Sequence, residues 1–304
     1  MDSPDRTHFL ADLKPGGKYE KIVGIFRKNS SAVRIGVFDK EIIYSLAEVG
    51  VKWIAHCGAG YDKIDILACK EKDISVSNTP GAVDDATATT ALYLMISSLR
   101  QFSKAERDVR EGLWKSRLSS ANAFDMTGRT LAILGLGGIG MRLAELAHVF
   151  PMRIVYHNRR KRDDVPDWCE YFPEDRLNEM LGITDVLSIH VPLRKETEGF
   201  VGDKMIRALK KGAIIVKTAR GKVIDEDAMI EALEDGHLGS VGLDVHPNEP
   251  KLNPRILELP QVTLLPHVGT ATFDSQKNME LRALNNLRDF LVKGRGIDVV
   301  PEML

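Results

Sequence analysis

The chain has 304 residues, of which 43% are hydrophobic and 28% are charged, and its formal net charge is −1. These values are typical of a globular protein with about two domains. Because a charge this close to zero gives no basic field, neither nucleic acid nor a membrane surface is an expected partner. The three cysteines, Cys57, Cys69 and Cys169, lack the CxxC spacing of a thiolate zinc site, and we expect no metal.

The N-terminal sequence MDSPDRTHFL lacks the basic start and the apolar run of a secretory signal. No apolar stretch approaches the ~20 residues that are needed to span a bilayer. The sequence therefore predicts a cytoplasmic protein without a membrane segment.

The N-terminal third of the chain predicts a small α/β region. Apolar strands are expected at residues 22–26, 52–55 and 74–77, followed by a long helix at about residues 83–112. Residues 1–20 are polar, and we find no strand in them.

From residue 130 onward, short apolar strands alternate with helical patterns. Helices are expected at residues 139–149 and 225–235, and a C-terminal helix near residues 273–292. The strands are expected at residues 130–134, 153–157, 185–190, 213–218, 240–245 and 262–265. This alternation predicts a doubly wound parallel sheet of the Rossmann type, with helices on both faces.

A glycine-rich turn follows the first of these strands. It consists of Gly135, Leu136, Gly137, Gly138, Ile139 and Gly140, and it fits the pattern G-x-G-x-x-G between a strand and a helix. The first glycine allows the tight turn, the second lets a pyrophosphate approach, and the last lets the helix pack closely. The turn predicts a dinucleotide site at the helix N-terminus, the alternative being a structural turn without a ligand.

The next strand ends in a basic segment. An NAD site places Asp or Glu about 20 residues past the glycines, whereas this chain has His157 and Asn158 there. Arg159 and Arg160 follow directly, and a guanidinium group can bind a ribose 2′-phosphate that a carboxylate would repel. The segment favours NADP(H) as cofactor, with NAD(H) possible. A solvated basic loop is the alternative reading.

Arg220, Glu249 and His267 follow three further strands of the predicted sheet. In open α/β sheets, ligands bind beyond the carboxyl ends of the strands, so these side chains can meet in one crevice. Arg220 can pair with the carboxylate of a 2-oxo acid, and His267 can protonate its carbonyl oxygen. Glu249, if paired with His267, would favour the imidazolium form.

With these motifs the chain resembles the D-isomer-specific 2-hydroxyacid dehydrogenase family, and within it the glyoxylate/hydroxypyruvate reductases. The resemblance covers about residues 23–300. It rests on the glycine turn, on His190-Val-Pro-Leu followed by Thr197, on Thr-Ala-Arg-Gly at 218–221, on Leu-Asp-Val with Glu249-Pro250, and on Pro266-His267.

The resemblance implies that Arg220, Glu249 and His267 form the catalytic set and that Asp244 holds the nicotinamide carboxamide. Arg220 and the backbone amides of Ala59 and Gly60 would bind the substrate. It also implies a set of cofactor contacts spread over the chain, namely Thr87, Gly135, Gly137, Gly138, Ile139, Gly140, Asn158, Arg159, Arg160, Val191, Pro192, Thr197, Thr218, Ala219, Arg220, Asp244, His267 and Gly269.

The domain organisation is also implied by the resemblance. A smaller flavodoxin-like α/β substrate domain would consist of residues 1–99 and 275–304, and a dinucleotide-binding domain of residues 100–274. The family forms homodimers through the cofactor domain, so we expect a homodimer here.

The chain departs from the family pattern at several places. Lys217 stands where the family usually has Asn, Thr89 where it often has Glu, and Cys57 beside the substrate loop, where a thiol is not expected. The family also begins with a strand that residues 1–20 do not show. The sheet of the small domain is therefore expected to be one strand short.

The predicted function is an NADPH-preferring reductase that converts glyoxylate or hydroxypyruvate to a D-2-hydroxy acid, with the proton supplied by His267. Two alternatives stay open. One is an NAD-dependent dehydrogenase of another D-2-hydroxy acid, and the other is a nicotinamide-sensing, corepressor-like binding protein. Substrate loops decide which 2-oxo acid is accepted, and the sequence does not give their shape.

Overall fold

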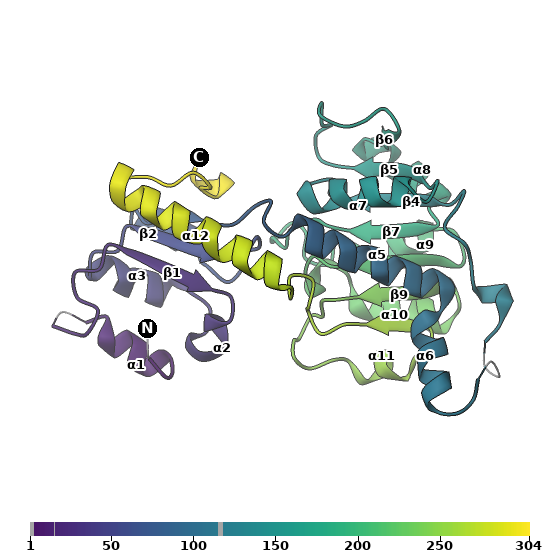
Figure 1. Cartoon of the computed structure of the whole chain (residues 1–304), viewed down its shortest axis with the longest axis horizontal. Helices are drawn as coiled ribbons and strands as arrows, with labels where there is room; N and C mark the ends of the chain where they lie inside the picture. The colour runs from purple at the N-terminus through teal and green to yellow at the C-terminus, as the bar shows by residue number, and fades with distance from the viewer. Residues whose placement is uncertain (1–2, 15, 115–117) are drawn as a thin grey trace. The chain divides into compact units, whose positions relative to one another are not determined.

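The computed structural model describes residues 3–14, 16–114 and 118–304, and the chain divides into two compact units (Figure 1). The larger unit is Asp84–Thr270, and the smaller one combines Met1–Val83 with Ala271–Leu304. This differs from the predicted division at 99/100 and 274/275. The difference arises because helix α5 (Asp84–Arg100) packs its buried face, including Ala91 and Leu94, into the core of the larger unit.

Among its described residues, the larger unit has one sheet of seven parallel strands in the order β10-β9-β8-β7-β4-β5-β6. The chain enters at β4, proceeds outward through β5 and β6, and then returns to β7 before it continues to the other edge. A doubly wound sheet places its ligand crevice where the strand order reverses, here between β4 and β7. The strands are β4 (Thr130–Leu134), β5 (Arg153–His157), β6 (Cys169–Tyr171), β7 (Val186–Ile189), β8 (Ala213–Lys217), β9 (Leu238–Leu243) and β10 (Val262–Leu264).

Helices cover both faces of this sheet (Figure 1). On one face lie α5 and α7 (Gly138–His148), and on the other lie α8 (Leu177–Ile183), α9 (Asp203–Ala208) and α10 (Glu226–Glu234). Every residue of β4 and of β8 is buried, as expected of strands that are covered on both sides. The remaining elements of this unit are α6 (Phe102–Arg110), α11 (Pro254–Glu258) and the 3-10 turns Ser120–Asn122, Glu174–Arg176 and Gly221–Val223.

The prediction of a single helix over residues 83–112 is wrong. Helix α5 ends at Arg100, and α6 begins at Phe102. Between them Gln101 has a left-handed backbone with φ 54°, and its side-chain amide donates to the Asn122 carbonyl. A helical pattern in the sequence does not reveal such a break, because it depends on a contact with a segment about 20 residues further along.

The smaller unit is built on the parallel strands β1 (Gly24–Lys28), β2 (Trp53–Cys57) and β3 (Ser75–Ser77), in the order β1-β2-β3. Helix α12 (Phe273–Lys293) packs on this sheet, with Phe290 stacked on Trp53 at a centroid distance of 5.1 Å. The other helices of the unit are α1 (Arg6–Asp12), α2 (Ser31–Ile35), α3 (Lys40–Glu48) and α4 (Ile66–Glu71), and a 3-10 turn lies at Pro301–Met303.

Helix α1 shows that the N-terminal segment contributes to this core. Asp5 caps the helix by accepting a hydrogen bond from the His8 amide. Phe9 is fully buried, and its ring lies 6.1 Å from that of Phe38. No strand is found between residues 3 and 20 of the described chain. The apolar pair Phe9 and Leu13, one helical turn apart, is the signal that a reading of this segment as polar misses.

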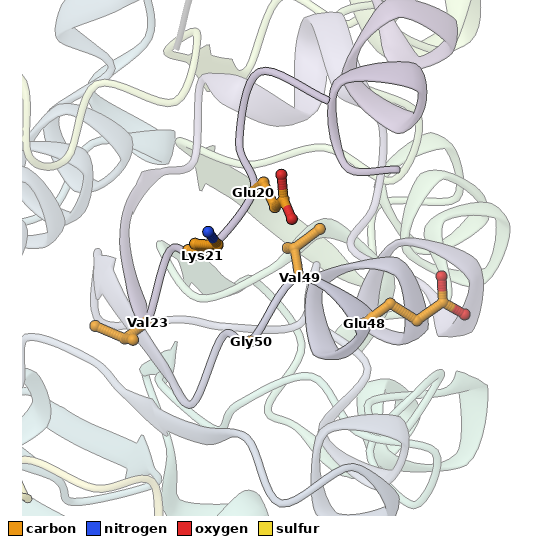
Figure 2. A pocket seen from close by; sticks show the side chains of 6 residues that line it. All are labelled: Glu20, Lys21, Val23, Glu48, Val49 and Gly50. Atoms are coloured by element: carbon orange, nitrogen blue, oxygen red, sulfur yellow. The ribbon is translucent and has the colours of Figure 1, made fainter. Parts of the chain in front are cut away.

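A hollow of about 360 Å³ in the smaller unit is lined by Glu20, Lys21, Val23, Glu48, Val49 and Gly50 (Figure 2). It lies beside the start of β1 and the end of α3, whereas the candidate residues Ala59 and Gly60 follow the carboxyl end of β2. The two features are therefore at opposite ends of these parallel strands. None of the described helices is both long and apolar enough to cross a membrane.

Candidate active site

In the glycine turn between β4 and α7, two positions have no room for a side chain. Gly135 has φ +92°, and a Cβ atom there would lie 2.9 Å from the Val191 nitrogen. A Cβ atom on Gly140 would lie 2.7 Å from the Gly135 carbonyl oxygen. These contacts match the tight turn and the close helix packing expected of a dinucleotide-binding turn.

Gly137, in contrast, faces open space: apart from its chain neighbours and its own helix, no atom of the described residues lies within 4 Å of the position of its Cβ. Gly137 is also the N-cap of α7, where unpaired N–H groups and the helix dipole favour an anion. The turn therefore fits a pyrophosphate. One neighbour was not foreseen: a Cβ atom on Gly138 would lie 2.0 Å from Asp84 Oδ2, so a carboxylate already lies against this helix end. The sequence places Asp84 more than 50 residues away and gives no signal for the contact.

The segment after β5 divides into residues that hold the turn and residues that face solvent. Asn158 Oδ1 accepts a hydrogen bond of 2.7 Å from the Leu136 amide, and Arg162 Nη1 donates to the Leu136 carbonyl at 2.9 Å. Arg159 and Arg160 are exposed. His157 is buried, with Nδ1 bonded to the Phe172 carbonyl and Nε2 3.1 Å from a Glu174 carboxylate oxygen, so both ring nitrogens already have partners within the protein.

The segment after β7 contains His190, Val191, Pro192 and Thr197. His190 Nε2 lies 2.8 Å from the Ser188 hydroxyl, and burial lowers the pKa of His190 to about 4, so that its ring is neutral at physiological pH. The Thr197 hydroxyl donates to the Pro192 carbonyl at 2.6 Å and accepts from the Arg194 amide at 2.8 Å. Thr197 therefore links the two ends of the loop formed by residues 192–197.

Three buried polar atoms at neighbouring strand ends have no hydrogen-bond partner among the described residues. They are His190 Nδ1, after β7, Thr218 Oγ1, after β8, and His246 Nδ1, after β9. Buried polar groups are nearly always satisfied, so such atoms are places where a bound molecule would supply the partner. Ala219 and Arg220 follow, and Arg220 Nη1 donates to the Ala219 carbonyl at 2.7 Å.

Glu249 and His267 form a hydrogen-bonded pair, with Glu249 Oε2 lying 2.8 Å from His267 Nδ1. Glu249 Oε1 accepts from the His246 amide at 2.9 Å, which fixes the carboxylate. Partial burial raises the pKa of Glu249, but the hydrogen bonds from His267 and His246 outweigh it, so the pKa lies below its ordinary value. The carboxylate is therefore charged throughout the neutral range. The side chains of His267 and Glu249 are 42% and 32% exposed, which leaves the ring accessible to a ligand.

Asp244 holds the segment that carries His267. Its two carboxylate oxygens accept hydrogen bonds from the amides of Val268 and Gly269 at 2.7 and 2.8 Å, and its carbonyl accepts from the His267 amide at 2.7 Å. Burial raises the pKa of Asp244, although the two amides oppose this shift. The main chain of His267 is held in a left-handed conformation with φ 56°. The Thr87 side chain lies close to Gly269, within 3.5 Å of the position of its Cβ.

Ala59 and Gly60 belong to the smaller unit and are held there by neighbouring side chains. The Asn78 amide donates to the Ala59 carbonyl at 2.7 Å, and His56 Nε2 lies 2.9 Å from the Gly60 carbonyl. Both residues are partly exposed. Cys57 is buried next to it, and burial raises the pKa of the thiol, which keeps it protonated.

Comparison with known proteins identifies the family. A family model described as the NAD-binding domain of D-isomer-specific 2-hydroxyacid dehydrogenases matches residues 92–269. The chain belongs to this family. It is 42% identical to 4-methyl-2-oxopentanoate reductase A of Aspergillus oryzae, over 99% of this chain and 89% of that protein.

Solved structures agree with this assignment. A glyoxylate reductase from Paecilomyes thermophila is 43% identical over 99% of this chain and 90% of its own, with a TM-score of 0.93. An NADPH-dependent glyoxylate/hydroxypyruvate reductase from Sinorhizobium meliloti, solved with NADP and malonate, is 29% identical over 94% of this chain and 87% of its own, with a TM-score of 0.83. The chain is thus an oxidoreductase of the 2-hydroxyacid dehydrogenase family that uses a nicotinamide cofactor.

The glycine turn yields a matched pair of substitutions. Gly137→Ala should leave the melting temperature of the cofactor-free protein nearly unchanged, because its φ of −89° suits alanine and its Cβ would meet no atom within 4 Å. The same Cβ would stand where a phosphate approaches, so NADPH should bind at least ~10-fold more weakly. Gly140→Ala should lower the melting temperature itself. Thermal melts and fluorescence titration with NADPH measure both, and full NADPH affinity in Gly137→Ala would contradict the cofactor site.

Proposed function

We propose that this dehydrogenase is an NADPH-preferring reductase that converts a small 2-oxo acid, glyoxylate or hydroxypyruvate, to the D-2-hydroxy acid. The observation that carries the proposal is the 2.8 Å hydrogen bond between Glu249 and His267 in the unit that also contains the glycine turn. A charged carboxylate on one ring nitrogen prepares the other nitrogen to act as an acid.

In this proposal Arg220, Glu249 and His267 are the catalytic set. Arg220 pairs with the carboxylate of the 2-oxo acid. The reduced nicotinamide, when bound, supplies the hydride to the carbonyl carbon. His267 transfers a proton from Nε2 to the carbonyl oxygen, because Nδ1 is already bonded to Glu249. Glu249 stabilises the imidazolium before the transfer and orients the ring throughout.

The cofactor would be held by the turn Gly135–Gly140 at its pyrophosphate and by Thr218 and His190, which each have a buried polar atom to satisfy. Thr87, Asp244 and Gly269 would lie at the nicotinamide end, and Val191, Pro192 and Thr197 along the segment after β7. Arg159 and Arg160 are exposed and uncommitted to the turn, unlike Arg162, and this supports them as ligands of a ribose 2′-phosphate.

A second candidate substrate is a bulkier 2-oxo acid. The relative from Aspergillus oryzae, named for 4-methyl-2-oxopentanoate, is as similar to this chain as the glyoxylate reductase structure is. The catalytic set would be the same, because both substrates present a carboxylate next to a carbonyl group. The two substrates would differ in the side chain that the enzyme accepts at C3. In this alternative the cofactor would be NADH.

We also propose that the enzyme is a homodimer through its larger unit. Large apolar side chains are exposed on α5, on α6 and at Trp114, including Tyr93, Phe102 and Val109, with Trp114 69% exposed. Such a surface is typical of an interaction site. Sedimentation as a monomer at micromolar concentration would contradict the proposal.

Steady-state kinetics with glyoxylate, hydroxypyruvate, pyruvate and 4-methyl-2-oxopentanoate, each with NADH and with NADPH, test the function. We expect the highest kcat/KM for glyoxylate or hydroxypyruvate with NADPH. A preference for 4-methyl-2-oxopentanoate would select the second candidate. Cofactor binding without turnover of any of the four acids would support a corepressor-like binding protein instead.

Cofactor preference is predicted to depend on Arg159 and Arg160. Replacing both with Gln should weaken NADPH by about 1.5–3 kcal/mol for each charge-assisted contact that is lost, while NADH changes little. Dissociation constants from fluorescence titration measure the effect. Replacing Arg153, which is paired with Glu170 at the opposite end of β5, is the control and should affect neither cofactor. Equal losses for NADH and NADPH would show that the two arginines do not read the 2′-phosphate.

The pH dependence of reduction is predicted to depend on the charge of Glu249. Reduction needs protonated His267, so the wild-type rate should fall as the pH rises. Glu249, whose own pKa is lowered, stays charged throughout the neutral range and favours the protonated ring. Glu249→Gln keeps a hydrogen bond but removes the charge, so the alkaline fall in the rate should move to lower pH.

His267→Ala is the reference for this measurement. It should lower kcat for reduction by roughly 10²–10⁴, the usual contribution of a positioned acid, with NADPH affinity nearly unchanged. The oxidation of the hydroxy acid should show the opposite pH trend, because neutral His267 then accepts the proton. If the pH profile of reduction is the same in Glu249→Gln and in the wild type, another group sets the protonation of the acid.

A further inference from the structure

Lys217 is a fully buried lysine at the carboxyl end of β8, immediately before the segment that carries Arg220. Its side chain has 0% exposure, and its Nζ donates a hydrogen bond of 3.0 Å to the Gly221 carbonyl. Burying an ammonium group is costly unless hydrogen bonds and opposite charges compensate. The burial of Lys217 is therefore best explained by the main-chain group that it binds, the Gly221 carbonyl.

The Gly221 main chain is packed directly on the segment that follows β9. A Cβ atom on Gly221 would lie 2.0 Å from the carbonyl carbon of His246. The His246 amide in turn donates to Glu249 Oε1, and the other oxygen of Glu249 is bonded to His267. A single lysine hydrogen bond thus fixes the point at which the segment of Arg220 touches the segment of Glu249.

We propose that Lys217 is a positioning residue of the active site, which through Gly221 sets the main chain of Arg220 against the His246–Glu249 segment. The inference rests on the proposed function, since it assigns Lys217 to the reaction of Arg220, Glu249 and His267. It differs from a merely structural role because the lysine also brings a positive charge close to the acid pair.

That charge is present at neutral pH. Burial lowers the pKa of Lys217 to about 8, and the negative charges of Glu226 on α10 and of Glu249 after β9 oppose this shift. The other titratable groups of residues 218–222 and 244–250 are Arg220, Lys222, Asp244 and His246. Protonated Lys217 therefore offsets part of the negative charge that Glu249 presents to His267, and its removal should favour the imidazolium form.

The experiment compares Lys217→Met, which removes both the charge and the donor, with Lys217→Gln, which removes the charge but keeps an N–H donor. In Lys217→Met, kcat/KM for the 2-oxo acid should fall about 10- to 100-fold, mainly through KM, because Arg220 is displaced. In Lys217→Gln, KM should return to within about threefold of the wild type. Lys222→Met is the matched control, since Lys222 is exposed on the same segment and should leave the kinetics unchanged.

The pH profile of reduction distinguishes a lysine that positions the site and contributes its charge from a lysine that only stabilises the fold. In both Lys217 variants the alkaline fall of the reduction rate should move to higher pH, opposite to the shift expected in Glu249→Gln. An unchanged KM in Lys217→Met would overturn the inference. So would a change in KM with no movement of the pH profile in either variant, because Lys217 would then only stabilise the fold.

A measurement without substrate keeps this inference separate from the proposed function. Hydrogen exchange of the peptides that cover residues 218–222 and 244–250 should be faster in Lys217→Met than in the wild type or in Lys222→Met, with the glycine turn unchanged. If the wild type reduces none of the 2-oxo acids, the proposed function fails while this measurement still decides whether Lys217 positions the two segments. Equal exchange in all three proteins would overturn the inference. If Lys217→Met does not fold, Lys217→Gln serves for the pH profile and for exchange.

Discussion

Every candidate residue of the larger unit except Thr87 follows the carboxyl end of a parallel strand, where the ladder of backbone hydrogen bonds stops. The main chain beyond that point must find other partners, because buried N–H and C=O groups are costly to leave unpaired. Polar side chains supply those partners at successive strand ends. Asn158 binds the Leu136 amide after β5, Thr197 binds the Pro192 carbonyl after β7, and Asp244 binds the amides of Val268 and Gly269 after β9.

The Glu249–His267 pair depends on this arrangement. Glu249 binds a backbone amide with one oxygen and His267 with the other, so the carboxylate that contacts the imidazole is also fixed to the main chain. Two opposite charges interact here, because Glu249 is negative and Lys217 is a buried cation. A site built in this way can favour a protonated imidazole without an excess of negative charge that would repel an anionic substrate.

The smaller unit uses the same principle at the end of β2. Buried Arg27 donates to His56 Nδ1 at 3.0 Å, which leaves the other ring nitrogen as the donor to the Gly60 carbonyl. Gly58, with φ +158°, bonds the Thr79 hydroxyl through its amide. The carbonyl groups of Ala59 and Gly60 are therefore both held by side chains of the same unit.

The sequence by itself determined the fold class, six of the seven strands described in the larger sheet to within two residues at their ends, and the glycine turn, but it missed the short edge strand β6. Such features depend on local periodicity and on steric rules within a few residues. It also indicated Arg220, Glu249 and His267, because side chains that follow parallel strands share one edge of the sheet. Only the tertiary structure decided where α5 ends, that Phe9 belongs to a core, that Asp84 lies against α7, and that Lys217 is buried beneath Gly221. Each of these depends on contacts between segments far apart in the chain, or on the burial of a charge, and a local pattern records neither.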